Sequence, residues 1–124
     1  MIKKAALAAL AIACSPTQAP CAFTCVLPGQ AATAGHCVER PEPVVLVSVN
    51  SCTDAPTRRA PVPGEAATIG DRTTTVIDRW LTWLVLADPC TPGESGSGVY
   101  GSDGALLGIV VENHSGQCYA DLLL

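Results

Sequence analysis

The alternation of apolar runs and turn residues from Gly64 onward predicts a series of short β-strands. The run at 73–77 is β-branched at almost every position, and turn residues such as Gly70-Asp71 and Ser102-Asp103-Gly104 separate the runs. The run at 81–86 is apolar enough for a helix, but it is short and is followed by Asp88-Pro89, which favours a strand. The expected strands are 66–69, 73–77, 81–86, 97–100, 105–111 and 118–124.

The chain before Gly64 predicts about three further strands. Residues 22–27 form a strand that turns at 28–30, and 31–37 form a second short strand or turn. The unbroken β-branched run at 44–49 predicts a buried strand. No strand should cross the irregular stretch at 50–64, because its prolines cannot donate to a ladder. The pattern as a whole predicts an all-β protein.

The composition indicates a small domain that needs covalent support. A chain of 124 residues is one domain or two very small ones, and only 4% of its residues are aromatic. Its 10 prolines and 11 glycines suit a β-rich fold, and a core of this size usually needs disulfides or other links. Seven cysteines suggest such disulfides, and therefore an oxidising compartment.

The N-terminus predicts export. Two lysines precede an apolar stretch at 5–13 that is too short to span a bilayer and fits a secretory signal peptide. The stretch ends in Ala11-Ile-Ala-Cys14, which suits an ordinary cleavage site and also resembles a bacterial lipobox. In the second interpretation, Cys14 becomes the lipidated first residue of the mature chain. We expect a signal peptide at 1–13, a lipid-anchored tether at 14–20, and a periplasmic or outer-membrane-anchored lipoprotein.

Charge and residue types exclude some classes of partner. Removal of both lysines with the signal peptide leaves five arginines against 11 acidic residues, a formal net charge of −6. No basic patch or row of stacking aromatic residues suggests nucleic-acid binding. The two histidines and the cysteines lack the spacing of zinc ligands. We expect a monomer without metal or cofactor, which touches the membrane only through its lipid anchor.

A serine between glycines is the strongest candidate for chemistry. In Pro92-Gly-Glu-Ser-Gly-Ser-Gly98, Gly93 and Gly96 permit backbone conformations that let successive N–H groups converge on one point. Such convergence suits an oxyanion hole with Ser95 as the nucleophile at its rim. A Gly/Ser-rich turn between strands is the alternative. A second stretch far upstream, Thr33-Ala-Gly-His36-Cys37, favours the catalytic interpretation.

Together these two stretches resemble the trypsin-like (chymotrypsin-fold) serine proteases. That family carries its histidine in Thr-Ala-Ala/Gly-His-Cys and its serine in Gly-Asp-Ser-Gly-Gly/Ser, in this order along the chain. The resemblance implies that Ser95 is the nucleophile of peptide-bond hydrolysis and that His36 is the base that takes its proton. It implies that the N–H groups of Gly93 and Ser95 hold the oxyanion. His114, in a turn, is expected to be a loop residue near the rim of the pocket.

The resemblance also implies a disulfide framework. One cysteine pair is similar to the family's histidine-loop disulfide, and a second to the disulfide that braces its substrate pocket. Two further cysteines then remain to pair with each other, and six cysteines allow 15 pairings, so this connectivity is a hypothesis. The three expected pairs are Cys21–Cys37, Cys90–Cys118 and Cys25–Cys52, which with a lipidated Cys14 account for all seven cysteines.

Asp88 is a candidate for substrate selection. In the trypsin branch, an aspartate two residues before the matching cysteine lies at the floor of the specificity pocket, and Asp88-Pro89-Cys90 resembles that arrangement. A buried carboxylate there would favour cleavage after Arg or Lys. A plain Asp-Pro turn at the end of a strand is the alternative.

The acid that completes the catalytic triad has three candidates. The family places an aspartate between its histidine and its serine, where it orients the imidazole. Asp54, Asp71 and Asp78 lie in this interval. Choosing Asp78 leaves too few residues for a second barrel of six strands. Treating 64–124 as that complete barrel instead leaves Asp54 upstream of it, and we select Asp54.

The expected fold is a pair of chymotrypsin-like antiparallel β-barrels over 21–124, with the second barrel near complete and the first strongly shortened. No Ile-Val-Gly-Gly-like terminus follows the signal, and Glu94 replaces the family's usual aspartate before the serine, so activation by a new N-terminus is not expected. The expected function is a serine endopeptidase that acts on polypeptides. The alternative is a catalytically inactive, protease-like lipoprotein that binds a protein partner.

Overall fold

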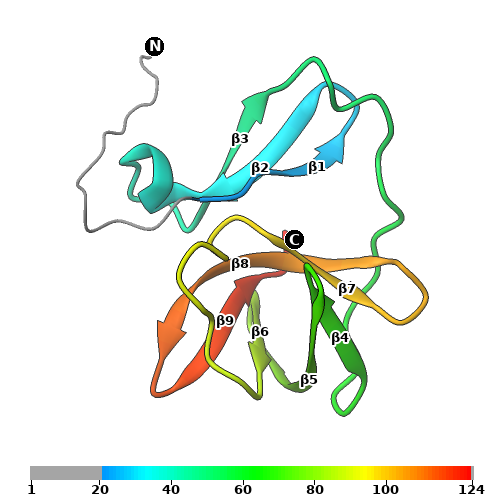
Figure 1. The fold of residues 1–124 in the computed structure, drawn as a ribbon, viewed down its shortest axis with the longest axis vertical. Helices are drawn as coiled ribbons and strands as arrows, with labels where there is room; N and C mark the ends of the chain where they lie inside the picture. The colour runs from blue at the N-terminus through cyan, green and yellow to red at the C-terminus, as the bar shows by residue number, and fades with distance from the viewer. Residues whose placement is uncertain (1–20, 124) are drawn as a thin grey trace.

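Residues 21–123 form an all-β fold in two parts in the computed structural model, which describes these residues (Figure 1). A three-stranded antiparallel sheet comes first and a closed six-stranded barrel follows. The expected signal peptide, the lipidation at Cys14 and the tether lie outside the described residues. Within the described part, no helix combines the length and the apolarity needed to cross a membrane.

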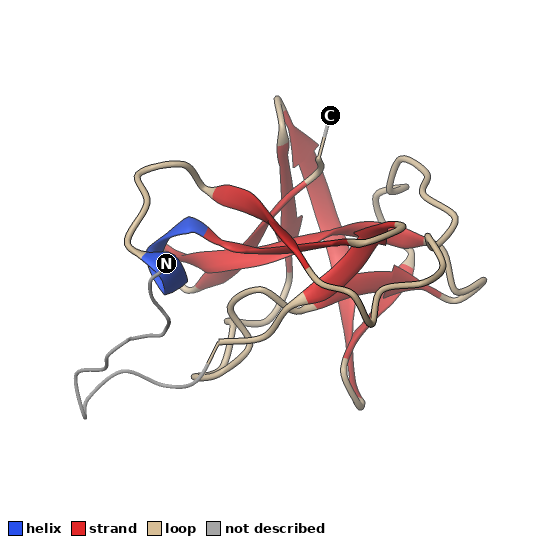
Figure 2. Ribbon diagram, turned by 90° about the horizontal axis from the view of Figure 1, so that it is seen from above, coloured by secondary structure: helices blue, strands red, loops and turns tan. Residues whose placement is uncertain are grey.

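The three-stranded sheet has the order β1-β2-β3 and continues from β2 into a short 3₁₀-helix, drawn in blue in Figure 2. Its elements are β1 (Thr24–Leu27), β2 (Gln30–Ala34), η1 (Gly35–Val38) and β3 (Val44–Ser48). The central strand β2 is covered on both faces, and its residues from Ala31 to Ala34 are at most 1% exposed. Small side chains in this strand let the layers on either side approach closely.

The barrel closes in the order β4-β5-β6-β9-β8-β7, with every neighbouring pair antiparallel. Closure leaves no free edge among these strands. The strands are β4 (Ala66–Ile69), β5 (Arg72–Trp80), β6 (Trp83–Leu86), β7 (Gly98–Gly101), β8 (Leu106–His114) and β9 (Gln117–Asp121).

Two apolar clusters hold the fold together. The barrel interior contains residues from all six strands, including Val76, Leu84 and Leu107, each at most 1% exposed. A second cluster joins Val26 and Ala32 of the sheet to Leu106 and Ile109 of the barrel. Because β8 contributes to both clusters, it connects the two parts of the molecule.

The structure confirms the all-β class and the expected number of strands on each side of Gly64. Residues 50–64 form no named strand, apart from an isolated bridge between Arg58 and Leu106. The expectation that 44–49 is a buried strand is wrong, because β3 lies at the sheet edge and Leu46 is 50% exposed. β5 extends to Trp80, beyond the expected end at 77, because its hairpin with β6 turns at Leu81.

The structure contains the three disulfides that the resemblance implied. They join η1 to the residues just before β1, β1 to the segment after β3, and the segment after β6 to β9. The pairs are Cys21–Cys37, Cys25–Cys52 and Cys90–Cys118. They are consistent with an extracytoplasmic protein, because such bonds persist in oxidising compartments.

Candidate active site

The loop between Cys90 and β7, which we call the serine loop (residues 91–97), carries Ser95 and folds through two tight turns. The N–H of Glu94 donates to Thr91 O at 3.1 Å, and that of Ser97 donates to Glu94 O at 2.8 Å. Gly93 and Gly96 both have a φ of +90°, which a residue with a side chain rarely adopts. The glycines that flank Glu94 and Ser95 are therefore required by the path of the backbone.

The serine loop is fixed to both parts of the molecule. Its Ser95 carbonyl accepts the N–H of Ala22 at 2.7 Å, and its Gly96 carbonyl accepts the hydroxyl of Thr24 at 2.8 Å. On the barrel side, the N–H of Gly96 donates to Val110 O at 2.8 Å. A Cβ on Gly96 would collide with the carbonyl oxygen of Ala22. In Figure 1 this loop runs along the junction between the sheet and the barrel.

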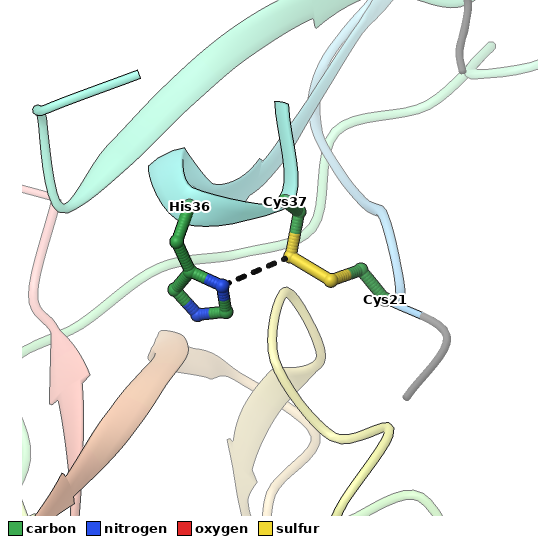
Figure 3. Close-up of side chains that lie close together, drawn as sticks. All are labelled: Cys21, His36 and Cys37. Carbon is green, nitrogen blue, oxygen red and sulfur yellow. Dashed lines mark hydrogen bonds between the residues drawn. A yellow bond between two sulfur atoms is a disulfide. The ribbon is translucent and has the colours of Figure 1, made fainter. Parts of the chain in front are cut away.

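His36 lies in η1 and is held beside a disulfide (Figure 3). Its Nδ1 is 3.9 Å from Cys37 Sγ, and Cys37 is bonded to Cys21. The two sulfurs and the imidazole are close enough together to resemble a set of metal ligands. The disulfide accounts for the proximity of the two sulfurs. Bonded sulfurs are not the free thiolates that metal ions prefer, so this group does not indicate a metal site.

His36 and Ser95 converge on one backbone oxygen, the carbonyl of Val111. His36 Nε2 lies 3.0 Å from this oxygen, and the Ser95 hydroxyl donates to it at 3.2 Å. Val111 interrupts the β8–β9 register between Val110 and Glu112, and this irregularity positions its carbonyl. The sheet and the barrel thus bring the two predicted residues next to each other, 59 positions apart in the chain.

The shared carbonyl also requires one ring nitrogen of His36 to donate. A carbonyl oxygen can only accept, so Nε2 must carry a proton to form this hydrogen bond. In this arrangement the Ser95 proton points to Val111 rather than to the imidazole, and no hydrogen bond joins the two side chains within residues 21–123. A base at Nε2 would need the opposite tautomer.

The two N–H groups expected in the oxyanion hole are available. Within residues 21–123, the amides of Gly93 and Ser95 have no protein acceptor, whereas those of Glu94, Gly96 and Ser97 are bonded. Free amides on a loop held by glycines can bind a negatively charged oxygen.

The structure does not bring Asp54 to His36. Asp54 is exposed and lines a cleft of about 590 Å³ between the sheet and the barrel, together with Phe23, Ser97 and Tyr100. His36 is not among the residues that line this cleft. Asp71 and Asp78 are also exposed, and across the described chain none of the three aspartates hydrogen-bonds to the imidazole.

Asp88 lies at the surface and does not line the cleft at Asp54, and its role in substrate selection stays a prediction. The residue is exposed, and its carboxylate accepts the hydroxyl of Thr74 at 2.8 Å. Asp88 lies in a bend two residues after β6 ends at Leu86, and Pro89 follows it. This is the Asp-Pro turn that was the alternative interpretation.

His114 lies at the end of β8, where its Nε2 is 2.6 Å from Glu112 Oε2 and its ring contacts Tyr119 edge-on. It is exposed, and neither of these two interactions involves the serine loop. His114 is thus the last residue of a strand and not a loop residue, which corrects that part of the expectation.

Arg72 was not predicted from the sequence, although it forms an ion pair with Glu94 of the serine loop. Its guanidinium donates to both carboxylate oxygens of Glu94, at 2.6 and 2.8 Å. Partial burial acts to raise the pKa of Glu94, but the hydrogen bonds from Arg72 and Thr91 outweigh it, so this pKa lies below its ordinary value. The only signal in the sequence is an acid next to Ser95, which does not identify its partner.

Comparison with known proteins assigns no family to this arrangement: no protein-family model matches the chain, and no curated protein matches it significantly.

Proposed function

We propose that this chain is a small serine endopeptidase with chymotrypsin-like architecture, exported and anchored through a lipid at Cys14. The closed barrel corresponds to the family's second barrel, and the three-stranded sheet to a shortened first barrel. The observation that carries the proposal is the convergence of Ser95 and His36, from different parts of the fold, on the carbonyl of Val111.

In the proposed reaction, Ser95 Oγ attacks the carbonyl carbon of a peptide bond while His36 takes the hydroxyl proton. The amides of Gly93 and Ser95 stabilise the oxyanion, and the protonated imidazole then gives its proton to the leaving amine. The first proton transfer, from Ser95 to His36, needs an unprotonated imidazole nitrogen that faces Ser95. Substrate binding must therefore be accompanied by a change of tautomer or a rotation of the ring away from Val111.

The absence of an acid at His36 within residues 21–123 lowers the expected rate. In enzymes with a complete triad, neutralising the aspartate costs about 10⁴-fold in turnover. The proposed endopeptidase is therefore slow. Any preference for Arg or Lys that Asp88 gives it is weakened, because this carboxylate is exposed and interacts with the charge of Arg72.

Labelling with a fluorophosphonate probe tests the proposal, because this reagent reacts with activated serines. We expect wild-type protein to be labelled, Ser95→Ala to lose the label, and Ser97→Ala, in the same loop, to keep it. His36→Gln should slow labelling at least about 100-fold, because general-base assistance contributes about 10²–10⁴-fold. Equal labelling of wild type and Ser95→Ala would contradict the proposal.

A protein-binding module without catalysis is the second candidate. It is favoured by the resting tautomer of His36 and by the cleft at Asp54, which lies between the sheet and the barrel and has mostly apolar walls. If wild type shows no Ser95-dependent label, this candidate replaces the first.

A further inference from the structure

The hairpin that joins β5 to β6 ends in an exposed apolar turn, which we call the tryptophan tip (residues 79–83). It contains both tryptophans of the chain. Trp80 is 57% exposed, and Leu81, at 73%, is the most exposed large apolar side chain among residues 21–123. Neither side chain belongs to the two apolar clusters that hold the fold together. Packing within the protein therefore does not explain them, and adjacent exposed apolar side chains of this size commonly mark a contact surface.

The tryptophan tip extends past the neighbouring strand of the barrel. β4 pairs with β5 only up to Thr75, and β6 is the only strand that pairs with residues 78–80. Residues 77–80 are all exposed, whereas Leu84, on the paired strand, is fully buried. The tip is thus accessible to a surface outside the protein, while β6 anchors it to the barrel core.

The backbone holds Leu81 at the end of the tip. Trp80 pairs directly with Trp83, so Leu81 and Thr82 form a two-residue turn. Leu81 has a φ of +57°, in the left-handed region, where asparagine and glycine are much more frequent than leucine. Trp83 is half-buried, and its ring meets that of Tyr119 edge-on at 6.0 Å. Neither packing nor backbone conformation favours leucine at position 81, which points to a role for its side chain outside the fold.

The polar groups of the tip suit the headgroups of a phospholipid bilayer. An indole ring combines an apolar body with one N–H donor, and tryptophan is enriched at membrane–water interfaces for this reason. Arg79, next to Trp80, is exposed and forms no ion pair within residues 21–123, whereas three other arginines do. Its guanidinium can bind a lipid phosphate while its aliphatic stem lies along apolar groups.

The size of the tip and the length of the tether favour a bilayer over a second copy of the chain. A stable protein–protein interface needs about 20–30 residues on each side, far more than the tip supplies. Insertion into a bilayer needs no such complementary surface. The proposed lipid anchor at Cys14 is seven residues from Cys21, a distance of at most about 25 Å in extended chain. An anchor at this position would keep the domain close to the membrane surface.

We propose that the tryptophan tip inserts into the headgroup region of a phospholipid bilayer. Trp80 and Leu81 enter the boundary between headgroups and acyl chains, and Arg79 binds a lipid phosphate. This inference goes beyond the proposed function, which needs the membrane only at Cys14. Contact at both the tip and the anchor gives the domain a fixed orientation on the membrane.

The experiment measures vesicle binding of the mature chain, starting at residue 14, with Cys14→Ser. This protein contains all of the described residues and carries no lipid, so binding depends on the folded domain. The vesicles contain phosphatidylcholine and phosphatidylglycerol. We expect tryptophan emission to shift to shorter wavelength when vesicles are added, because the indole rings leave water.

Leu81→Asn, made in this lipid-free chain, is the decisive variant. Asparagine tolerates the left-handed conformation, so the turn is kept while the apolar side chain is lost. We expect vesicle partitioning to fall at least about 10-fold, because membrane binding scales with the apolar area that is buried. Leu46→Thr is the matched control, since Leu46 is a 50% exposed leucine on β3, outside the tip, and threonine keeps the strand preference. Its partitioning should equal that of the parent chain.

Three results would overturn the proposal. They are an unshifted emission of the parent chain with vesicles, equal partitioning of the parent and Leu81→Asn, and an emission shift that depends on protein concentration without vesicles. The last would show that a second copy covers the tip. Ser95 labelling without vesicles should be the same in Leu81→Asn and the parent, so failure of the endopeptidase proposal leaves the membrane result unaffected.

Discussion

The carbonyl oxygen of Val111 is the point at which the two candidate catalytic side chains meet. No side-chain property of valine contributes to this role, because the contact is made by the main chain at an irregularity of β8. The sequence could therefore point to His36 and Ser95 through their motifs, but not to the atom that joins them. The same limit applies to Arg72 and Glu94, which are 22 residues apart and meet only in the folded chain.

Gly96 is where the backbone of the serine loop approaches the sheet most closely. We expect Gly96→Ala to destabilise the protein more than Gly104→Ala, by about 1–3 kcal/mol, because both have positive φ but only Gly96 lacks space for a Cβ. Urea denaturation of the two variants measures the difference in the free energy of unfolding. Equal destabilisation would show that the loop moves away from Ala22 at no cost.

Most strands were predictable because short β-branched runs alternate with turn residues, and β4 agrees with its expected range. Interruptions of register were not predictable, since one extra residue in a strand leaves the apolar pattern almost unchanged. The exposure of β3 was missed for a related reason. A run of β-branched residues predicts a strand, but it does not reveal whether another strand covers its outer edge.

The Cys25–Cys52 disulfide ties β1 to the segment that follows β3, across a separation of 27 residues. Replacing both cysteines by alanine should lower the free energy of unfolding by roughly 2–4 kcal/mol, because the unfolded chain loses a cross-link. Chemical denaturation of wild type and the double variant measures this change. Since neither cysteine lies in the serine loop, the folded variant should still be labelled at Ser95. Loss of the label would contradict a purely stabilising role of this disulfide.

The whole molecule consists of two parts joined by a segment without regular structure between β3 and β4. Ion pairs of Arg59 hold this segment to the barrel. Arg59 donates to Glu65 just before β4 and to Asp103 in the turn after β7. It lowers the pKa of Asp103 to about 2 and holds that of Glu65 below its ordinary value. The all-β class and the number of strands on each side of Gly64 were predictable from the sequence, whereas these ion pairs join residues that are far apart in it.

Acid should weaken the fold through these carboxylates. A carboxyl group whose pKa is lower in the folded state stabilises the protein above its unfolded pKa of about 4, and this contribution is lost as the pH falls through the folded value. We expect the Tm to be flat above about pH 5 and to decrease toward pH 2. Thermal unfolding across this range should show a smaller decrease for Arg59→Met, and an identical pH profile would exclude a contribution from this ion pair.

The burial of β2 limits which amino-acid substitutions the protein can tolerate. Its residues from Ala31 to Ala34 are all but inaccessible on both faces, so the strand has no side on which a larger residue could be accommodated. His36 follows β2 by only two positions and takes its placement from it. We therefore expect few substitutions at residues 31–34 during neutral evolution. Random mutagenesis followed by selection for folded protein should recover substitutions in β3 much more often than at these four positions.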